Sequence, residues 1–277
     1  MAVSAAPAAS LPLVYGGHPD QVADLYLPAG TEPGLPLLLF FHGGFWRAGH
    51  DRGHVTGFVR ALAAETGCAV ANVEYRRVGG AGGWPVTFTD TARAADLLPG
   101  LAARAAEGRI DPARVMYAGH SAGGHLALWA ALRHRLPEGA PGRAATPPAV
   151  LGVLALAPTA DLAWADELGS GRGAVAGLLG GGRARVPDRF AAADPAVLGA
   201  PAGRTVVVHG VRDEALPVAM SRRYAATTGA TLHELPGCGH FEVIDTASAA
   251  WPVTVGAVRG LVAEGGTLAG RESRRAP

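Results

Sequence analysis

The stretch that decides the fold is VMYAGHSAGGHLALWAAL, residues 115–132. It begins as a short apolar run, turns through Gly119-His120-Ser121-Ala122-Gly123, and continues as an Ala- and Leu-rich sequence typical of a helix. A serine between two glycines, at a tight turn from strand to helix, is typical of a nucleophile elbow. Because 40 glycines make the bare pattern a weak signal, the strand and helix around it carry the prediction that Ser121 is a nucleophile.

Outward from this stretch, short apolar runs alternate with Ala-rich stretches, which predicts an α/β fold with a mostly parallel sheet covered by helices on both faces. We expect strands over 22–27, 37–41, 69–75, 115–118, 150–156, 205–209 and 231–235. We expect helices over 53–66, 89–106, 122–134, 218–227 and 252–262. A chain of 277 residues is long enough for one such domain over 1–277.

Two segments look irregular. Residues 137–148 are rich in Pro, Gly and Ala and predict a surface loop. Residues 161–203 separate two strands by far more than a crossover needs, and they contain helical fragments such as 173–179. We interpret this segment as a small cap or lid over the carboxyl edge of the sheet, with a merely long loop as the alternative.

Composition and charge exclude several classes of partner. The formal net charge is +1, and the only concentrated basic run is the group of arginines within 271–275, so we expect no nucleic-acid partner. No stretch approaches the length of a membrane span, and residues 1–9 lack the pattern of a signal peptide. The expected location is therefore the cytoplasm, with no membrane partner.

The sequence predicts no cofactor and no metal. Cys68 and Cys238 form no Cys-x-x-Cys pattern and are too few for a disulfide framework. The histidines that lie close together in sequence lack a matching pattern of acidic partners. These are His50, His54, His120 and His125.

A serine hydroxyl needs a base and an orienting acid, which in this kind of fold follow the nucleophile in the order acid, then base. His240 comes after the last expected strand in a Gly-rich loop and is the predicted base. The alternative is a surface histidine of that loop with no catalytic role. Asp213 comes just past the strand over 205–209, where a carboxylate would orient that imidazole. Asp161, one strand earlier, is the competing acid.

The sequence His42-Gly43-Gly44-Phe45-Trp46 directly follows the strand over 37–41. Two glycines there expose backbone N–H groups, so we predict an oxyanion hole formed by the amides of Gly43, Gly44 and Ala122, with the Phe45 amide as a substitute. His42 is expected to brace the loop by hydrogen bonds.

With these motifs the chain resembles the α/β-hydrolase family, in particular its His-Gly-Gly lipases and esterases and, within them, the arylformamidases or kynurenine formamidases. The motifs at 42–46 and 119–126, Glu74-Tyr75-Arg76 and His240-Phe241 carry the resemblance, which spans about 26–241. It implies cleavage of a small aryl formamide such as N-formylkynurenine through an acyl-enzyme. Phe45 stands where those enzymes usually have Tyr, which removes a hydroxyl from the substrate side.

The sequence does not decide between several classes of substrate. The alternatives to a formamide are short-chain carboxylesters, a thioester or cyclisation substrate of a biosynthetic enzyme, and a non-catalytic binding role. We predict that aromatic side chains contact the small-molecule ester or amide, although each could equally pack in the core. These are Phe45, Trp46, Trp84 and Phe241. The oligomeric state is also open, with a homodimer among the options.

Overall fold

The computed structural model describes residues 10–272, with side chains described as far as Glu264. The segment considered for a signal peptide and the arginines beyond 272 lie outside these residues. The described part forms a single sheet of eight strands in the order β1-β2-β4-β3-β5-β6-β7-β8. The strands are β1 (Leu11–Val14), β2 (Val22–Tyr26), β3 (Leu35–Phe41), β4 (Ala69–Val73), β5 (Ile110–His120), β6 (Gly152–Leu156), β7 (Arg204–Gly210) and β8 (Thr231–Leu235).

The expected α/β architecture is confirmed. All seven expected strands are present. The strands β3 to β8 run parallel to one another, whereas β2 is antiparallel to both of its neighbours, β1 and β4. β1 was not predicted, because a four-residue edge strand that contains Pro12 gives almost no periodic signal. The parallel strands bring their carboxyl ends to one edge of the sheet, where the loops with the predicted site residues begin.

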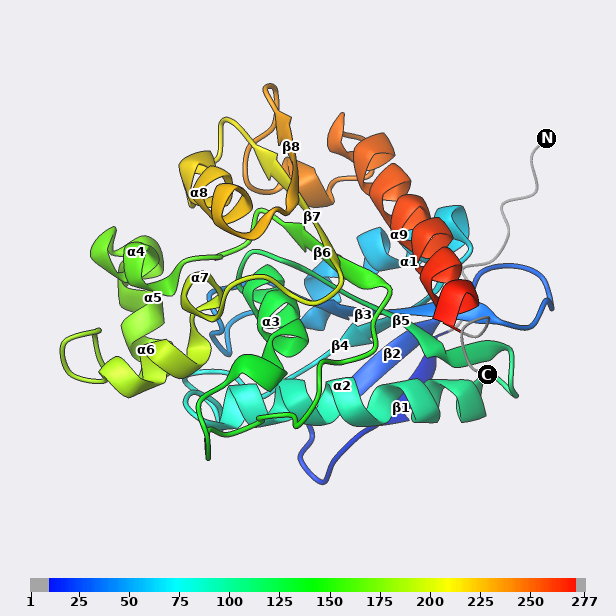
Figure 1. Cartoon of the computed structure of the whole chain (residues 1–277), viewed down its shortest axis with the longest axis horizontal. Helices are drawn as coiled ribbons and strands as arrows, with labels where there is room; N and C mark the ends of the chain where they lie inside the picture. Colours follow the sequence, from blue (N-terminus) through cyan, green and yellow to red (C-terminus); the bar gives the residue numbers. More distant parts are fainter. Residues whose placement is uncertain (1–9, 273–277) are drawn as a thin grey trace.

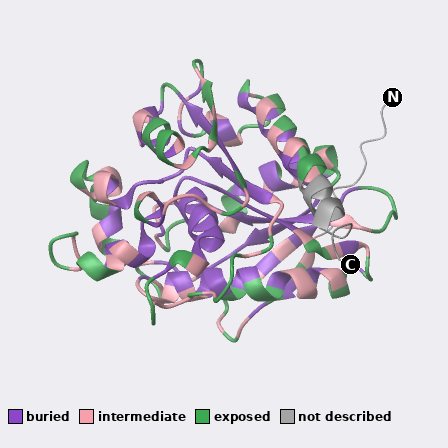
Figure 2. Ribbon diagram, in the orientation of Figure 1, coloured by how far each residue is buried: buried purple, intermediate pink, exposed green. Residues whose placement is uncertain are grey.

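Helices cover both faces of the sheet (Figure 1). They are α1 (Thr56–Thr66), α2 (Val86–Ala105), α3 (Ala122–Ala131), α8 (Val218–Thr228) and α9 (Ala250–Glu272), with short 3-10 turns η1 (Arg52–Val55), η2 (Arg133–Arg135) and η3 (Glu242–Ile244). Alternate side chains of β3 divide between two cores: Leu37 and Leu39 pack on the side of α2 and α3, and Leu38 and Phe40 on the side of α1 and α9. All ten residues of α3 are buried, so this helix lies at the centre of the molecule (Figure 2).

The segment 161–203 folds into four short helices beside α3 (Figure 1). They are α4 (Leu162–Glu167), α5 (Ser170–Leu179), α6 (Pro187–Ala193) and α7 (Pro195–Leu198). Two side chains of α3 tie the end of α6 down: a ring nitrogen of His125 bonds to the Ala193 carbonyl oxygen at 2.9 Å, and the indole N–H of Trp129 donates to the Ala192 carbonyl oxygen at 2.9 Å. The helical fragments are as expected, and a cap function for them stays a prediction. Residues 137–148 contain no helix or strand, as expected.

Candidate active site

Ser121 occupies a strained turn between β5 and α3. Its φ of 54° and ψ of −118° place a non-glycine residue in a sparsely populated backbone region, as a nucleophile elbow requires. The glycines on either side have no room for a side chain. A Cβ on Gly119 would lie 2.2 Å from the carbonyl oxygen of Gly123, and one on Gly123 would lie 1.9 Å from that of Phe41. The motif is therefore a steric requirement of this turn.

The Gly-Gly loop after β3 lies directly beside the elbow. A Cβ on Gly43 would come within 3.3 Å of the Cβ of Ser121, and one on Gly44, where φ is 110°, would meet the side chain of His50 at 2.4 Å. Phe45 and Trp46 both have positive φ, and the Arg47 amide donates to the Gly44 carbonyl oxygen at 3.0 Å, which closes a tight turn. The loop thus passes close to the nucleophile, and a side chain at Gly44 would clash with His50.

Asp213 and His240 are joined by a short hydrogen bond. Nδ1 of His240 lies 2.6 Å from Oδ2 of Asp213, so the loops after β7 and β8 bring the predicted acid and base together. With a proton on Nδ1, the imidazole presents Nε2 as the free acceptor. This is the tautomer that can take a proton from a serine hydroxyl.

The Asp213 carboxylate is stabilised as an anion. Burial by itself raises its pKa, but hydrogen bonds from His209 and His240 and backbone N–H donors outweigh burial and hold the pKa well below its usual value. The amides of Ala215 and Leu216 donate to Oδ1 at 2.8 Å, and Nε2 of His209 lies 3.1 Å from Oδ2. The acid is therefore charged and held in place before any substrate binds.

The competing acid, Asp161, has a different role. Its Oδ1 accepts a hydrogen bond from the Trp164 amide at 2.8 Å and caps α4, while Oδ2 lies 3.5 Å from the guanidinium of Arg223. His240 pairs with Asp213 and not with Asp161, so the geometry favours the first of the two sequence alternatives.

His120, the residue before the predicted nucleophile, packs against the predicted base. The ring centroids of His120 and His240 lie 4.7 Å apart, and Nε2 of His120 lies 2.9 Å from the carbonyl oxygen of His240. Burial, followed by repulsion from His240, lowers the pKa of His120 to about 3, so the ring is neutral and donates through Nε2. His120 therefore links the elbow to the loop of the base.

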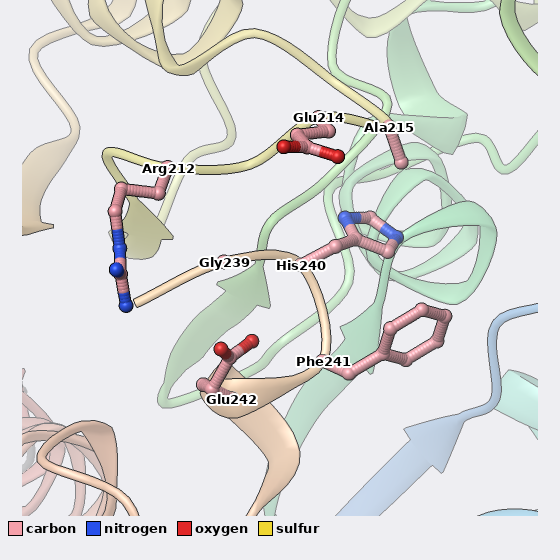
Figure 3. A pocket seen from close by; sticks show the side chains of 7 residues that line it. All are labelled: Arg212, Glu214, Ala215, Gly239, His240, Phe241 and Glu242. Atoms are coloured by element: carbon pink, nitrogen blue, oxygen red, sulfur yellow. The ribbon is translucent and has the colours of Figure 1, made fainter. Parts of the chain in front are cut away.

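A cavity of about 430 Å³ opens beside His240 (Figure 3). It is lined by Arg212, Glu214, Ala215, Gly239, His240, Phe241 and Glu242. In Figure 3 the rings of His240 and Phe241 extend from the loop that follows β8, and Glu214 reaches in from the loop that follows β7. The Phe241 side chain is 68% exposed, so it offers apolar surface next to the predicted base.

The aromatic residues predicted to contact substrate fall into different environments. Phe241 lines the cavity beside His240, and its contact with substrate stays a prediction. Trp46 is fully buried, packs its ring against His125, and donates its indole N–H to the Ala122 carbonyl oxygen at 3.1 Å, so the structure puts it in the core. Phe45 packs against the backbone of Gly171 in α5, and half-buried Trp84 packs against Phe88. For Trp46, the structure therefore agrees with the alternative that the side chain packs in the core.

Three polar residues of the site had not been singled out from the sequence. In the sequence, His209 is the last residue of an expected strand, and Glu74 and Tyr75 belong to the motif at 74–76, to which no site role was assigned. The structure makes all three hydrogen-bonding neighbours of site residues. Two signals could have found them: a polar residue at the carboxyl end of an apolar strand and, for Glu74 and Tyr75, the motif at 74–76.

Neither metal clusters nor membrane helices occur in the described part. Among residues 10–272, no group of three or more His, Cys, Asp and Glu side chains could hold a metal ion. No helix in that range is both long and apolar enough to cross a membrane.

The sheet order, the elbow and the acid–base pair on successive loops define an α/β-hydrolase, and solved structures agree. Esterase B from Lactobacillus rhamnosis aligns with a TM-score of 0.78 over 96% of this chain and 90% of that chain, at 20% identity. A truncated carbohydrate esterase from gut microbiota aligns with a TM-score of 0.75 over 94% of this chain and 99% of that chain, at 19% identity. At these identities the likeness establishes the fold.

The chain belongs to the BD-FAE family, whose profile matches residues 23–227. It is 34% identical over 62 residues to the kynurenine formamidase of Danio rerio, which is 22% of this chain and 20% of that protein. It is 32% identical over 112 residues to the carboxylesterase NlhH of Mycobacterium tuberculosis, which is 40% of this chain and 34% of that protein. The matched regions thus span only about a fifth to a third of these relatives' own lengths.

Proposed function

We propose that this chain is a serine hydrolase that cleaves a small ester or amide through an acyl-enzyme. Ser121 attacks the carbonyl carbon while His240 takes its proton, and Asp213 stabilises the imidazolium that forms. The same imidazolium then protonates the departing alcohol or amine, and water activated by His240 releases the acid. The observation that carries this proposal is the 2.6 Å bond between His240 and Asp213 next to the strained elbow of Ser121.

The oxyanion of the tetrahedral intermediate would lie among the amides of Gly43, Gly44 and Ala122. Ala122 is the first residue of α3, so its amide has no partner within the helix. Within the described residues, the Gly43 and Gly44 amides donate to no other backbone group. Each such donor contributes about 2.7–4 kcal/mol to the transition state in comparable sites.

For the substrate we propose an aryl formamide such as N-formylkynurenine. The match to a kynurenine formamidase supports it, as does the aromatic surface of Phe241 beside the base, since the leaving group departs on the side from which His240 protonates it. A short-chain carboxylester is the second candidate. It is favoured by the longer match to a carboxylesterase and by Phe45, which lacks the hydroxyl usual in formamidases.

A biosynthetic thioester or cyclisation substrate is a third candidate. It draws support from 32% identity over 143 residues to the non-reducing polyketide synthase Preu3 of Preussia isomera, a match that spans 49% of this chain and 5% of that protein.

Two measurements test the proposal. A fluorophosphonate should label wild-type protein with one adduct on Ser121, and Ser121→Ala should show neither adduct nor turnover while it unfolds at the same denaturant concentration. Kinetics on a matched panel of N-formylkynurenine, formanilide, p-nitrophenyl acetate and p-nitrophenyl butyrate then ranks the substrates. An adduct on another residue would overturn the assigned nucleophile, and rapid ester cleavage with N-formylkynurenine untouched would overturn the formamidase.

A further inference from the structure

The two glycine peptide groups that offer the predicted oxyanion donors both have hydrogen-bonding partners at their carbonyl oxygens. A trans peptide unit is planar, with its N–H and C=O pointing in opposite directions, so whatever holds the carbonyl also aims the amide. The amide of Gly43 belongs to the peptide whose carbonyl is that of His42. The amide of Gly44 belongs to the peptide whose carbonyl is that of Gly43.

Tyr75 holds the first of these peptides. Its hydroxyl donates to the His42 carbonyl oxygen at 2.8 Å, and its ring stacks on the His42 imidazole with centroids 4.5 Å apart and planes 14° from parallel. The Tyr75 side chain is completely buried. Burial, reinforced by the nearby Glu74 carboxylate, raises the pKa of Tyr75 well above its usual value, so the hydroxyl keeps the proton that it donates.

His42 holds the second peptide. Its Nδ1 lies 2.7 Å from the Gly43 carbonyl oxygen, and its Nε2 lies 2.8 Å from Oε1 of Glu74. Both partners are acceptors, so both bonds form together only when each ring nitrogen carries a proton. Although burial raises the pKa of Glu74, hydrogen bonding and charge from His42 outweigh it and lower the pKa, so the partner of the ring is an anion.

We infer that Tyr75, together with the His42–Glu74 pair, positions the oxyanion hole by fixing and polarising its two glycine peptides. A carbonyl that accepts a hydrogen bond makes the N–H of the same peptide a stronger donor, because hydrogen bonds in a chain polarise one another. Preorganised donors stabilise the oxyanion without reorganising during the reaction. The inference rests on the proposed function, since it concerns the oxyanion hole of that mechanism.

Tyr75→Phe tests this inference, because it removes one hydroxyl and keeps the stacked ring. The control is Tyr224→Phe, since Tyr224 is also buried and its hydroxyl donates to a backbone carbonyl, that of Gly199, at 3.5 Å, without contacting the His42–Glu74 pair. We expect Tyr75→Phe to lower kcat about fivefold to tenfold with KM unchanged. It should weaken binding of a trifluoromethyl ketone, which forms a tetrahedral adduct, by a similar factor. Tyr224→Phe should change neither value, although both variants lose stability.

Fluorophosphonate titration of active sites gives kcat per folded molecule in each preparation. If Tyr75→Phe does not accumulate as folded protein, His42→Gln carries the test, because it removes the ring donor to Gly43 and should show the same split between kcat and KM. If wild-type protein turns over substrate, and Tyr75→Phe keeps the same kcat and ketone affinity as Tyr224→Phe, the inference alone is overturned. Wild-type protein that turns over no substrate and forms no ketone adduct would overturn the proposed function itself.

Discussion

The ring of His120 donates a hydrogen bond of 2.9 Å to the backbone carbonyl of His240, so the residue before the predicted nucleophile holds the loop that carries the predicted base. The two rings lie 4.7 Å apart, and the neutral state of His120 avoids a second positive charge beside the imidazolium that forms during the reaction. The relation connects two positions 120 residues apart in the chain. This hydrogen bond therefore links the position of the elbow to that of the loop that carries His240.

From this relation we predict that His120→Phe lowers kcat about fivefold, because a buried hydrogen bond contributes about 1 kcal/mol and its loss leaves the loop of His240 less constrained. His120→Gln is the matched control, since its amide can still donate to the same carbonyl. Steady-state kinetics on one ester substrate checks both variants. Equal rates for His120→Phe and wild type would show that the loop needs no such tether.

The two aspartates that the sequence offered as acids can be separated directly. We predict that Asp213→Asn lowers kcat by about 10³–10⁴-fold, because the amide no longer stabilises the imidazolium and favours the wrong tautomer. Asp161→Asn should keep kcat and lose at most about 1 kcal/mol of stability, because Asn can still cap α4 and the ion pair that it removes is with the exposed side chain of Arg223. Kinetics and urea unfolding of the two variants decide the matter, and a large loss of kcat in Asp161→Asn would reverse the assignment.

The strands and the main helices could be predicted because apolar periodicity is a local property of the sequence. Ser121, Asp213 and His240 were accessible for the same reason, since each follows an apolar strand and has a recognisable local setting. The hydrogen bonds of Tyr75 and His209 were not accessible, because they join segments through the geometry of turns. Tyr75 lies beyond the end of β4 and His42 beyond the end of β3, so their contact depends on the pairing of these strands and on the turns that follow them.

Trp46 shows a limit of predicting substrate contacts from the sequence. Its place in the motif at 42–46 suggested a substrate contact, yet the ring is buried and packs against His125 of α3. Whether the ring lies on the substrate side or in the core depends on the tertiary packing around it, and side-chain type alone does not reveal it.

Buried neutral histidines predict a loss of stability in mild acid. Burial, partly offset by the bond to Ala193, lowers the pKa of His125 to about 4, and that of His120 falls to about 3. In the unfolded chain both rings gain a proton below about pH 6.5, whereas the folded state resists it. The unfolded state therefore binds more protons, and the free energy of unfolding should fall as the pH decreases from about 6.5 toward 4.

Asp194 acts in the opposite direction over part of this range, because burial raises its pKa to about 6 and its protonation favours the folded state as the pH falls. A comparison with His125→Gln isolates one ring, since Gln can still donate to Ala193. Between pH 6.5 and 4.5 this variant should lose about 2 kcal/mol less than wild type, measured by urea unfolding at both values. Identical losses would mean that His125 takes up a proton without unfolding.

Phe241 offers the most direct test of leaving-group recognition, since its ring is 68% exposed and lies at the cavity beside His240. Truncation to Ala removes apolar surface from the proposed leaving-group side without opening a cavity in the core, so stability should change by less than about 0.5 kcal/mol. We expect KM for aryl substrates to rise about fivefold to tenfold, and KM for methyl esters of the same acyl group to stay constant. Val197→Ala, which truncates a 59% exposed side chain elsewhere, should alter neither constant. If Phe241→Ala changes KM equally for aryl substrates and methyl esters, the ring acts by positioning His240, and the aryl group binds on another side of the nucleophile.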